Sequence, residues 1–179
     1  PAVVDELIPN LMTIGEVQKV LQNLLREGVP IRNTSVILEA LGDQAGVTRD
    51  PNMLTEYARS ALARVISRQY RGSGGEIVVA TVDPEIEEGI ARLMEASPDT
   101  GMLGPDRNFS QTVVSQVAQM AEKMAAGGHQ PIVLTRPGVR VYLKRIIERV
   151  LPNVVVLSYS EISDDEKVRS VGMVSLGED

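Results

Sequence analysis

The chain has 179 residues, enough for one large domain or two small ones, and its 18 basic and 24 acidic side chains give a net charge of −6. Residues 1–71 are neutral overall, so the negative charge lies in residues 72–179 and argues against a general nucleic-acid-binding protein. The lack of cysteine excludes disulfides, thiolate metal sites and a cysteine nucleophile, and it fits a cytoplasmic location.

The chain begins at Pro1 rather than methionine, so we expect a fragment of a longer protein. No apolar run approaches the length needed to cross a bilayer, and no signal peptide is recognisable. Any membrane segments of the parent protein would therefore lie outside this chain.

The most informative segment runs from Thr13 to Arg32 and predicts a capped amphipathic helix. Thr13 and Glu16 have the spacing of a capping box, in which each side chain accepts a hydrogen bond from the other residue's backbone N–H. Gly28 is placed for the left-handed turn that ends a helix, and Pro30 stops the helix from resuming. Five apolar residues at the helical period predict one buried stripe: Val17, Val20, Leu21, Leu24 and Leu25.

Helix signals fill the rest of residues 1–71, which we predict to form an all-helical subdomain. Thr34 is expected to cap a short helix, and Asp50 followed by Pro51 is a cap with proline at the first helical position. The predicted helices are Val3–Ile8, Ile14–Glu27, Thr34–Leu41 and a long amphipathic helix from Pro51 to Ile66.

The segment Gly72-Ser-Gly-Gly75 marks the boundary to a second subdomain and indicates a flexible hinge or a tight turn. It does not fit a phosphate loop, because its glycines precede a strand instead of joining a strand to a helix.

Residues 72–179 alternate between strand and helix patterns. We therefore predict a small α/β subdomain with a mostly parallel sheet. The expected strands are Ile77–Val82, Pro131–Thr135, Val154–Leu157 and a weaker one at Val168–Leu176. The expected helices run from Pro84 to Ala96, from Ser110 to Ala126 and onward from Pro137, and residues 97–108 are expected to form a loop.

Two arginines at the end of a predicted parallel strand are candidates for binding an anion or a partner carboxylate. Arg136 and Arg140 lie between a strand and a helix start, where α/β sheets bind ligands. The alternative, which we weigh more heavily, is a proline-initiated helix with solvated arginines.

Other polar clusters favour structural roles over catalysis. Ser158 and Ser160 follow the third strand, but His129, the only histidine, is expected near the opposite edge of the sheet. The acidic run Asp164-Asp165-Glu166 is typical of a solvated turn, because a cation site needs oxygens from several positions. With no metal set and no dinucleotide fingerprint, we expect no cofactor and a docking or assembly module, not an enzyme.

Several motifs in order resemble the FHIPEP family of type III secretion export-gate proteins, which serve flagella and injectisomes. The resemblance covers about Val3 to Leu176, and it matches the last two of four cytoplasmic parts of such proteins, a helical third part and an α/β fourth part. The quoted motifs are Val4–Pro9, Thr13–Arg32, Val36–Leu41, Leu54–Arg59 and Leu157–Ile162.

The resemblance implies protein export instead of catalysis. It implies a cytoplasmic domain of an inner-membrane protein that assembles with itself into a ring of nine. The expected partners are flagellar export chaperones with cargo, the export ATPase with its stalk, and other export-gate membrane proteins. The third part is linked to ring contacts, so the candidate subunit or partner contacts are Gln18, Gln22, Arg26 and Arg32.

Several alternatives stay open. The four polar candidates could be solvated surface, or Arg26 and Arg32 could merely fix the turns of the helical subdomain. The chain could also belong to the injectisome branch instead of the flagellar one. It could also be a small α/β ligand-binding or enzyme domain that uses Arg136, Arg140 and Ser158.

Overall fold

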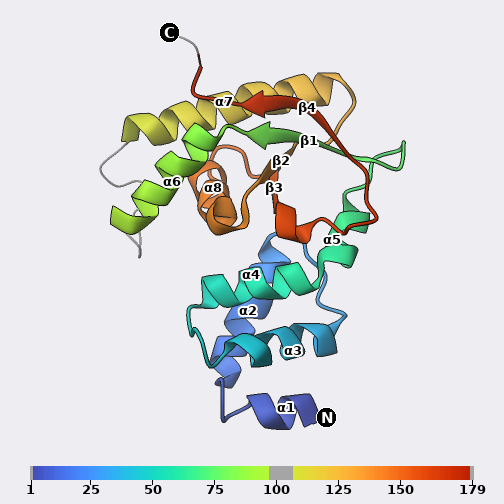
Figure 1. The fold of residues 1–179 in the computed structure, drawn as a ribbon, viewed down its shortest axis with the longest axis vertical. Coiled ribbons are helices and arrows are strands. Elements are labelled where there is room, and N and C mark those ends of the chain that lie inside the picture. Colours follow the sequence, from blue (N-terminus) through green and yellow to red (C-terminus); the bar gives the residue numbers. More distant parts are fainter. Residues whose placement is uncertain (1, 97–106, 178–179) are drawn as a thin grey trace. The chain divides into compact units, whose positions relative to one another are not determined.

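A computed structural model describes residues 2–96 and 107–177 (Figure 1). The chain divides into two compact units, Pro1–Gln69 and Tyr70–Asp179, which we describe separately. Among the described helices, none combines the length and apolarity that are needed to cross a bilayer.

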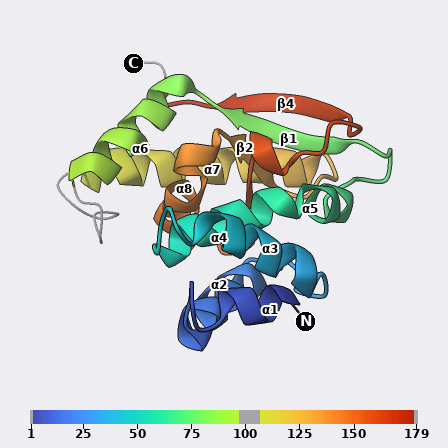
Figure 2. The ribbon, with the colours of Figure 1, turned by 60° about the horizontal axis from the view of Figure 1, so that its bottom comes forward.

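The first unit is helical, as the sequence predicts. Helix α4 packs against α2 and α3, and α1 packs against α3 (Figure 2). The bounds are α1 Ala2–Leu7, α2 Ile14–Arg26, α3 Thr34–Gln44, α4 Pro51–Ala61 and α5 Ala63–Gln69.

The capping box that begins α2 is confirmed. The backbone N–H of Thr13 donates to Glu16 Oε1 at 2.9 Å, and the backbone N–H of Glu16 donates to Thr13 Oγ1 at 3.1 Å. Gly28 adopts a φ of 74° directly after the helix, the left-handed conformation that its position predicts. At the start of α4, Asp50 Oδ1 accepts the backbone N–H of Asn52 at 2.9 Å.

Three details of the helical unit differ from the sequence prediction. Asn33, not Thr34, occupies the cap position of α3, and the helix continues through Gly42 to Gln44, because one glycine weakens a helix without ending it. The predicted long helix breaks at Leu62, whose N–H donates to two earlier carbonyls, so that α5 begins anew at Ala63. 

The predicted stripe of α2 is also wrong at one position. Leu25 is 54% exposed, whereas Asn23 is buried. The buried side of α2 therefore includes Asn23 and leaves out Leu25. A polar residue can occupy the interior when it has a hydrogen-bond partner there.

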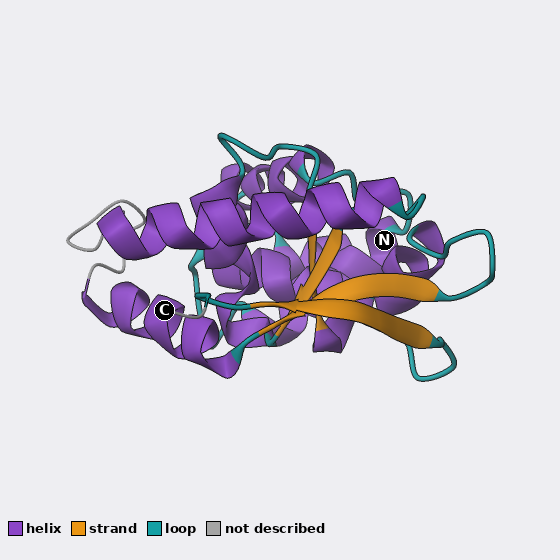
Figure 3. Ribbon diagram, turned by 90° about the horizontal axis from the view of Figure 1, so that it is seen from above, coloured by secondary structure: helices purple, strands orange, loops and turns teal. Residues whose placement is uncertain are grey.

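The second unit is α/β, and its sheet is parallel throughout the described residues. The strand order in this four-stranded sheet is β3-β2-β1-β4. Figure 3 shows the strands in orange and the helices in purple. The bounds are β1 Ile77–Val82, α6 Pro84–Ala96, α7 Arg107–Ala126, β2 Ile132–Thr135, η2 Pro137–Val139, α8 Arg140–Ile147, β3 Val155–Ser158, η3 Tyr159–Glu161 and β4 Val168–Val174.

Helix α7 begins three residues before the expected start at Ser110, and most of the loop predicted at residues 97–108 lies outside the described residues. Alternate residues of β1 contribute to one apolar core that includes side chains from α6, α7 and α8. Its most buried members include Ala80, Ile86, Ile90, Val113, Val117, Leu143 and Ile147.

Candidate functional site

The outer face of α2 combines exposed amides, an arginine and exposed apolar side chains. Gln18, Gln22 and Arg26, three of the predicted contact residues, are all exposed. Ile14 is 71% and Leu25 54% exposed, and both lie on the same side of the helix as Gln18, one turn before it and two turns after it. We call these five residues the outer face of α2.

Arg32, the fourth predicted contact, lies beyond α2 in the segment that leads to α3. It is exposed and lines a groove of about 290 Å³ together with Pro30, Asn33 and Val65 of α5. The groove belongs wholly to the helical unit.

Buried polar groups hold α2 against α4. Asn23 Nδ2 donates to Thr55 Oγ1 at 3.1 Å, and Thr55 Oγ1 donates to the carbonyl of Pro51 at 2.6 Å. The Arg59 guanidinium, 2% exposed, lies 3.9 Å from the Glu27 carboxylate. The sequence analysis did not predict that these polar residues are buried. The signal that could have identified them is a polar residue at a position that the helical period places on the apolar face.

Arg136 lies at the carboxyl end of β2, as predicted, and pairs with α6. Its guanidinium donates to Glu88 Oε1 at 2.8 Å. This hydrogen bond, together with the attraction between the two opposite charges, lowers the pKa of Glu88 and raises the pKa of Arg136. Its backbone N–H donates to Glu87 Oε2 at 2.9 Å, which also accepts from Thr135 Oγ1 at 2.6 Å. These contacts tie the end of β2 to α6.

Arg140 is fully buried, so the structure does not bring it together with Arg136 at the surface. Its guanidinium donates to the Val156 carbonyl at 3.0 Å and lies 3.5 Å from Glu161. Glu161 accepts the backbone N–H of Ser158, and Ser158 Oγ lies 2.8 Å from Ser160 Oγ. The buried pair thus supports the turn that follows β3.

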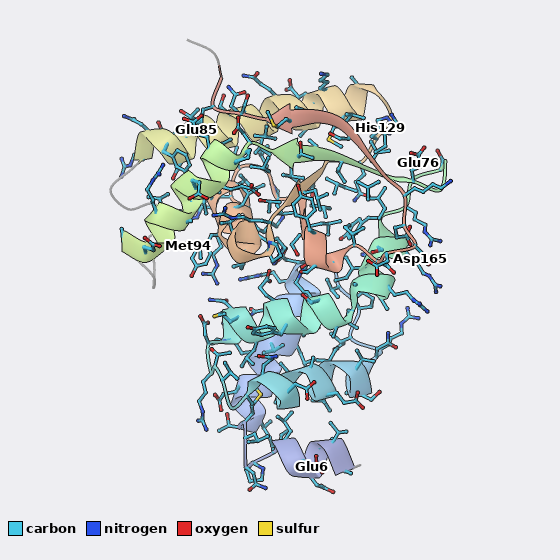
Figure 4. All side chains as sticks on the ribbon, viewed as in Figure 1. Glu6, Glu76, Glu85, Met94, His129 and Asp165 are labelled. Atoms are coloured by element: carbon cyan, nitrogen blue, oxygen red, sulfur yellow. The ribbon has the colours of Figure 1, made fainter. Side chains whose placement is uncertain are left out.

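The two remaining polar motifs are His129 and the acidic run at residues 164–166. Because Thr135 pairs with Ser158 in parallel strands, His129 lies before the opposite, amino end of β2 (Figure 4). In the acidic run, Glu166 accepts hydrogen bonds from Arg71, and Ser163 Oγ donates to Asp165. Both Glu166 and Asp165 therefore have partners within the protein.

Open α/β sheets bind ligands at the carboxyl ends of strands, at the point where the strand order reverses. Here that point is the end of β1 and the start of α6, because β2 lies on one side of β1 and β4 on the other. Asp83 caps this helix by accepting the backbone N–H of Glu85 at 2.9 Å. The carboxylates of Asp83 and of Glu85, which Figure 4 labels, therefore occupy the helix N-terminus and would repel a phosphate.

Comparison with known proteins decides the family. The model of the FHIPEP family matches residues 1–167. The chain belongs to the FHIPEP family. The resemblance that the sequence motifs indicate is therefore confirmed, and it holds along nearly the whole chain.

One relative in this family is the flagellar biosynthesis protein FlhA of Bacillus subtilis, which is 36% identical over 98% of this chain and 26% of its own length. The chain thus spans about a quarter of the length of the FlhA proteins that it matches.

Two solved structures are similar along the whole chain. The CdsV protein of Chlamydia pneumoniae, in a complex with the CdsO protein, has a TM-score of 0.84 and 28% identity over 98% of this chain and 50% of that one. The nonameric EscV cytosolic domain from a type III secretion system has a TM-score of 0.78 and 26% identity over 97% of this chain and 51% of that one.

Proposed function

We propose that this chain is the ring-forming part of the cytosolic face of a flagellar type III export gate, and that it docks other proteins without catalysing a reaction. Membership of the FHIPEP family over residues 1–167 is the observation that carries this proposal. The identity with FlhA and the nonameric assembly of the similar EscV domain support it.

The outer face of α2 is our candidate for the contact between neighbouring copies. Ile14 and Leu25 expose apolar surface that would be removed from water when two copies associate. Gln18 and Gln22 can form hydrogen bonds across the contact. Arg26 and, beyond the helix, Arg32 provide charges at the border of such a patch.

Site-specific cross-linking tests this contact in the complete cytosolic part of the protein. A photoreactive residue at Gln18 should produce a ladder of cross-linked copies, whereas one at Val47, which is 79% exposed on the same unit, should not. Equal ladders from the two positions, or none from Gln18, would overturn the assignment.

We further propose docking to flagellar export chaperones with cargo, to the export ATPase with its stalk, and to other export-gate membrane proteins. The complex of the similar CdsV protein with CdsO supports the view that proteins similar to this chain bind protein partners. A pull-down with the complete cytosolic part should retain a cargo-loaded chaperone or the stalk, and failure to retain any of these proteins would contradict docking.

The flagellar branch is proposed over the injectisome branch because flagellar biosynthesis proteins FlhA reach 36% and 37% identity, against 25–29% for the similar solved structures CdsV, MxiA and InvA. Export of flagellar cargo provides the test. A full-length protein that carries this segment should restore motility to a flagellar mutant, and restored injectisome secretion without motility would favour the other branch.

A further inference from the structure

Strand β4 forms one edge of the sheet, since β1 lies on one side of it and no described strand lies on the other. Its first three residues, at positions 168–170, are exposed, whereas three of the four residues of β3, at the opposite edge, are buried. Val168 is 41% exposed although it is apolar. An exposed edge strand presents backbone N–H and C=O groups that can pair with another chain.

The register of the two strands shows which backbone groups of β4 face away from β1. The Ile77 N–H donates to the Lys167 carbonyl at 2.9 Å, so the backbone of Lys167 faces β1. Because backbone groups alternate in direction along a parallel strand, those of Val168 and Ser170 face away from β1. The first half of β4 therefore presents the N–H and C=O groups of both residues to a strand added at this edge.

A β-bulge limits this edge to the first half of the strand. Ser170 pairs with Val79, whereas the next residue of β1 pairs with Gly172, so Val171 is an extra residue in β4. Ser170 Oγ spans the bulge by donating to the Gly172 carbonyl at 3.1 Å. A Cβ atom at Gly172 would lie 2.8 Å from Met120 Cε, which shows that α7 packs closely on β4 just beyond the bulge. A strand added at this edge therefore pairs with residues 168–170.

The charges beside this edge indicate an acidic partner. Lys167 and Arg169 flank Val168 and are exposed, in a unit that otherwise carries an excess of acidic side chains. Arg169 lies 3.7 Å from Glu76, so Lys167 is our main candidate for the cation that meets a partner carboxylate. A second copy of this chain fits less well, because its own Lys167 and Arg169 would place like charges along the shared edge.

We propose that residues 168–170 bind an extended acidic segment of a partner protein, which adds a strand to the sheet outside β4. The backbone of this segment exchanges hydrogen bonds with Val168 and Ser170, and its carboxylates lie beside Lys167 and Arg169. One of its apolar side chains covers Val168. The site lies within the second unit and does not depend on the contact proposed for α2, so either proposal can fail without the other.

Three short peptides test the proposal on the complete cytosolic part of the protein. One alternates valine with glutamate, one alternates valine with lysine, and one is the glutamate peptide with every backbone amide N-methylated. At millimolar concentration the glutamate peptide alone should slow hydrogen exchange of residues 167–174 about tenfold, as mass spectrometry measures it. No slowing, or equal slowing by either other peptide, would overturn the proposal. Slowing that rises with protein concentration without peptide would overturn it too, because a second copy would then occupy the edge.

Two variants locate the binding site on β4. Ser170→Pro removes an outward N–H, a change that edge strands tolerate, and should abolish the slowing by the glutamate peptide. Lys167→Glu should weaken binding of that peptide about threefold, whereas Lys123→Glu, the same change of charge at an exposed position on α7, should leave it unaltered. Unchanged slowing in a folded Ser170→Pro variant would contradict the proposal. If circular dichroism shows that Ser170→Pro unfolds, the comparison of Lys167→Glu with Lys123→Glu decides, and equal affinities of these two variants would contradict it.

Discussion

At the residue scale, the molecule depends on a few polar and glycine positions that hydrophobic patterns do not reveal. Asn23 and Thr55 form a buried hydrogen bond between α2 and α4, although both would be taken for surface residues from their chemistry alone. Such a pair stabilises little when complete, but it is costly to break because the remaining partner stays buried.

We therefore predict that Thr55→Val lowers the free energy of unfolding by about 1–3 kcal/mol. The substitution keeps the shape and leaves Asn23 Nδ2 without the acceptor that it uses. Urea unfolding measures the change, and Thr112→Val on the surface of α7, where the hydroxyl bonds the Asn108 carbonyl, is the matched control. Equal effects of the two substitutions would show that burial of the Asn23 bond is unimportant.

A second prediction concerns Gly89, where α6 meets the only phenylalanine of the chain. A Cβ atom at Gly89 would lie 2.5 Å from Phe109 Cζ, so Gly89→Ala should destabilise the protein by about 1–3 kcal/mol in thermal or urea unfolding.

Gly42→Ala is the control for this prediction, because nothing lies within 4 Å of the added carbon. It should stabilise α3 by about 0.5–1 kcal/mol, since alanine is the better helix former. If both substitutions stabilise the protein, Phe109 does not pack on Gly89 as the structure has it.

At the scale of the elements, two helix starts could be predicted, but the cap of α3 and the ends of α3 and α4 could not. The Thr13–Glu16 box and the Asp50-Pro51 start are local chemistry, so their residues predict them directly. The break at Leu62 and the passage of α3 through Gly42 depend on packing, which no local pattern records.

The cap of α2 leads to a pH prediction. The hydrogen bond from the Thr13 backbone is the main cause that lowers the pKa of Glu16 below its ordinary value of 4.5. The carboxylate therefore contributes stability above its unfolded pKa, and this contribution is lost as the pH falls through the lower folded pKa.

Glu16→Gln should accordingly be less stable than the natural protein at pH 7, and the difference should vanish near pH 3. Urea midpoints at the two pH values measure it, with the exposed Glu39→Gln as the control. A difference of the same size at both pH values would contradict a role for the charge.

At the scale of the whole molecule, the sequence predicts the helical and α/β parts and the parallel sheet, because strands separated by helices leave few other arrangements. The strand order is less accessible, since the β3–β4 connection carries only the short helix η3. The candidate contacts Gln18, Gln22 and Arg26 could be placed on an exposed face from periodicity alone. The burial of Arg140 could not be predicted from periodicity, because its partners Val156 and Glu161 come from later in the chain.

We propose that copies of this protein assemble through the outer face of α2. Sedimentation of the complete cytosolic part at increasing concentration tests it most directly, with Leu25→Glu compared with the equally charged control Val47→Glu. We expect the natural protein and Val47→Glu to form the same large assembly, and Leu25→Glu to stay monomeric with an unchanged melting temperature. An assembly that forms equally well with Leu25→Glu would contradict it.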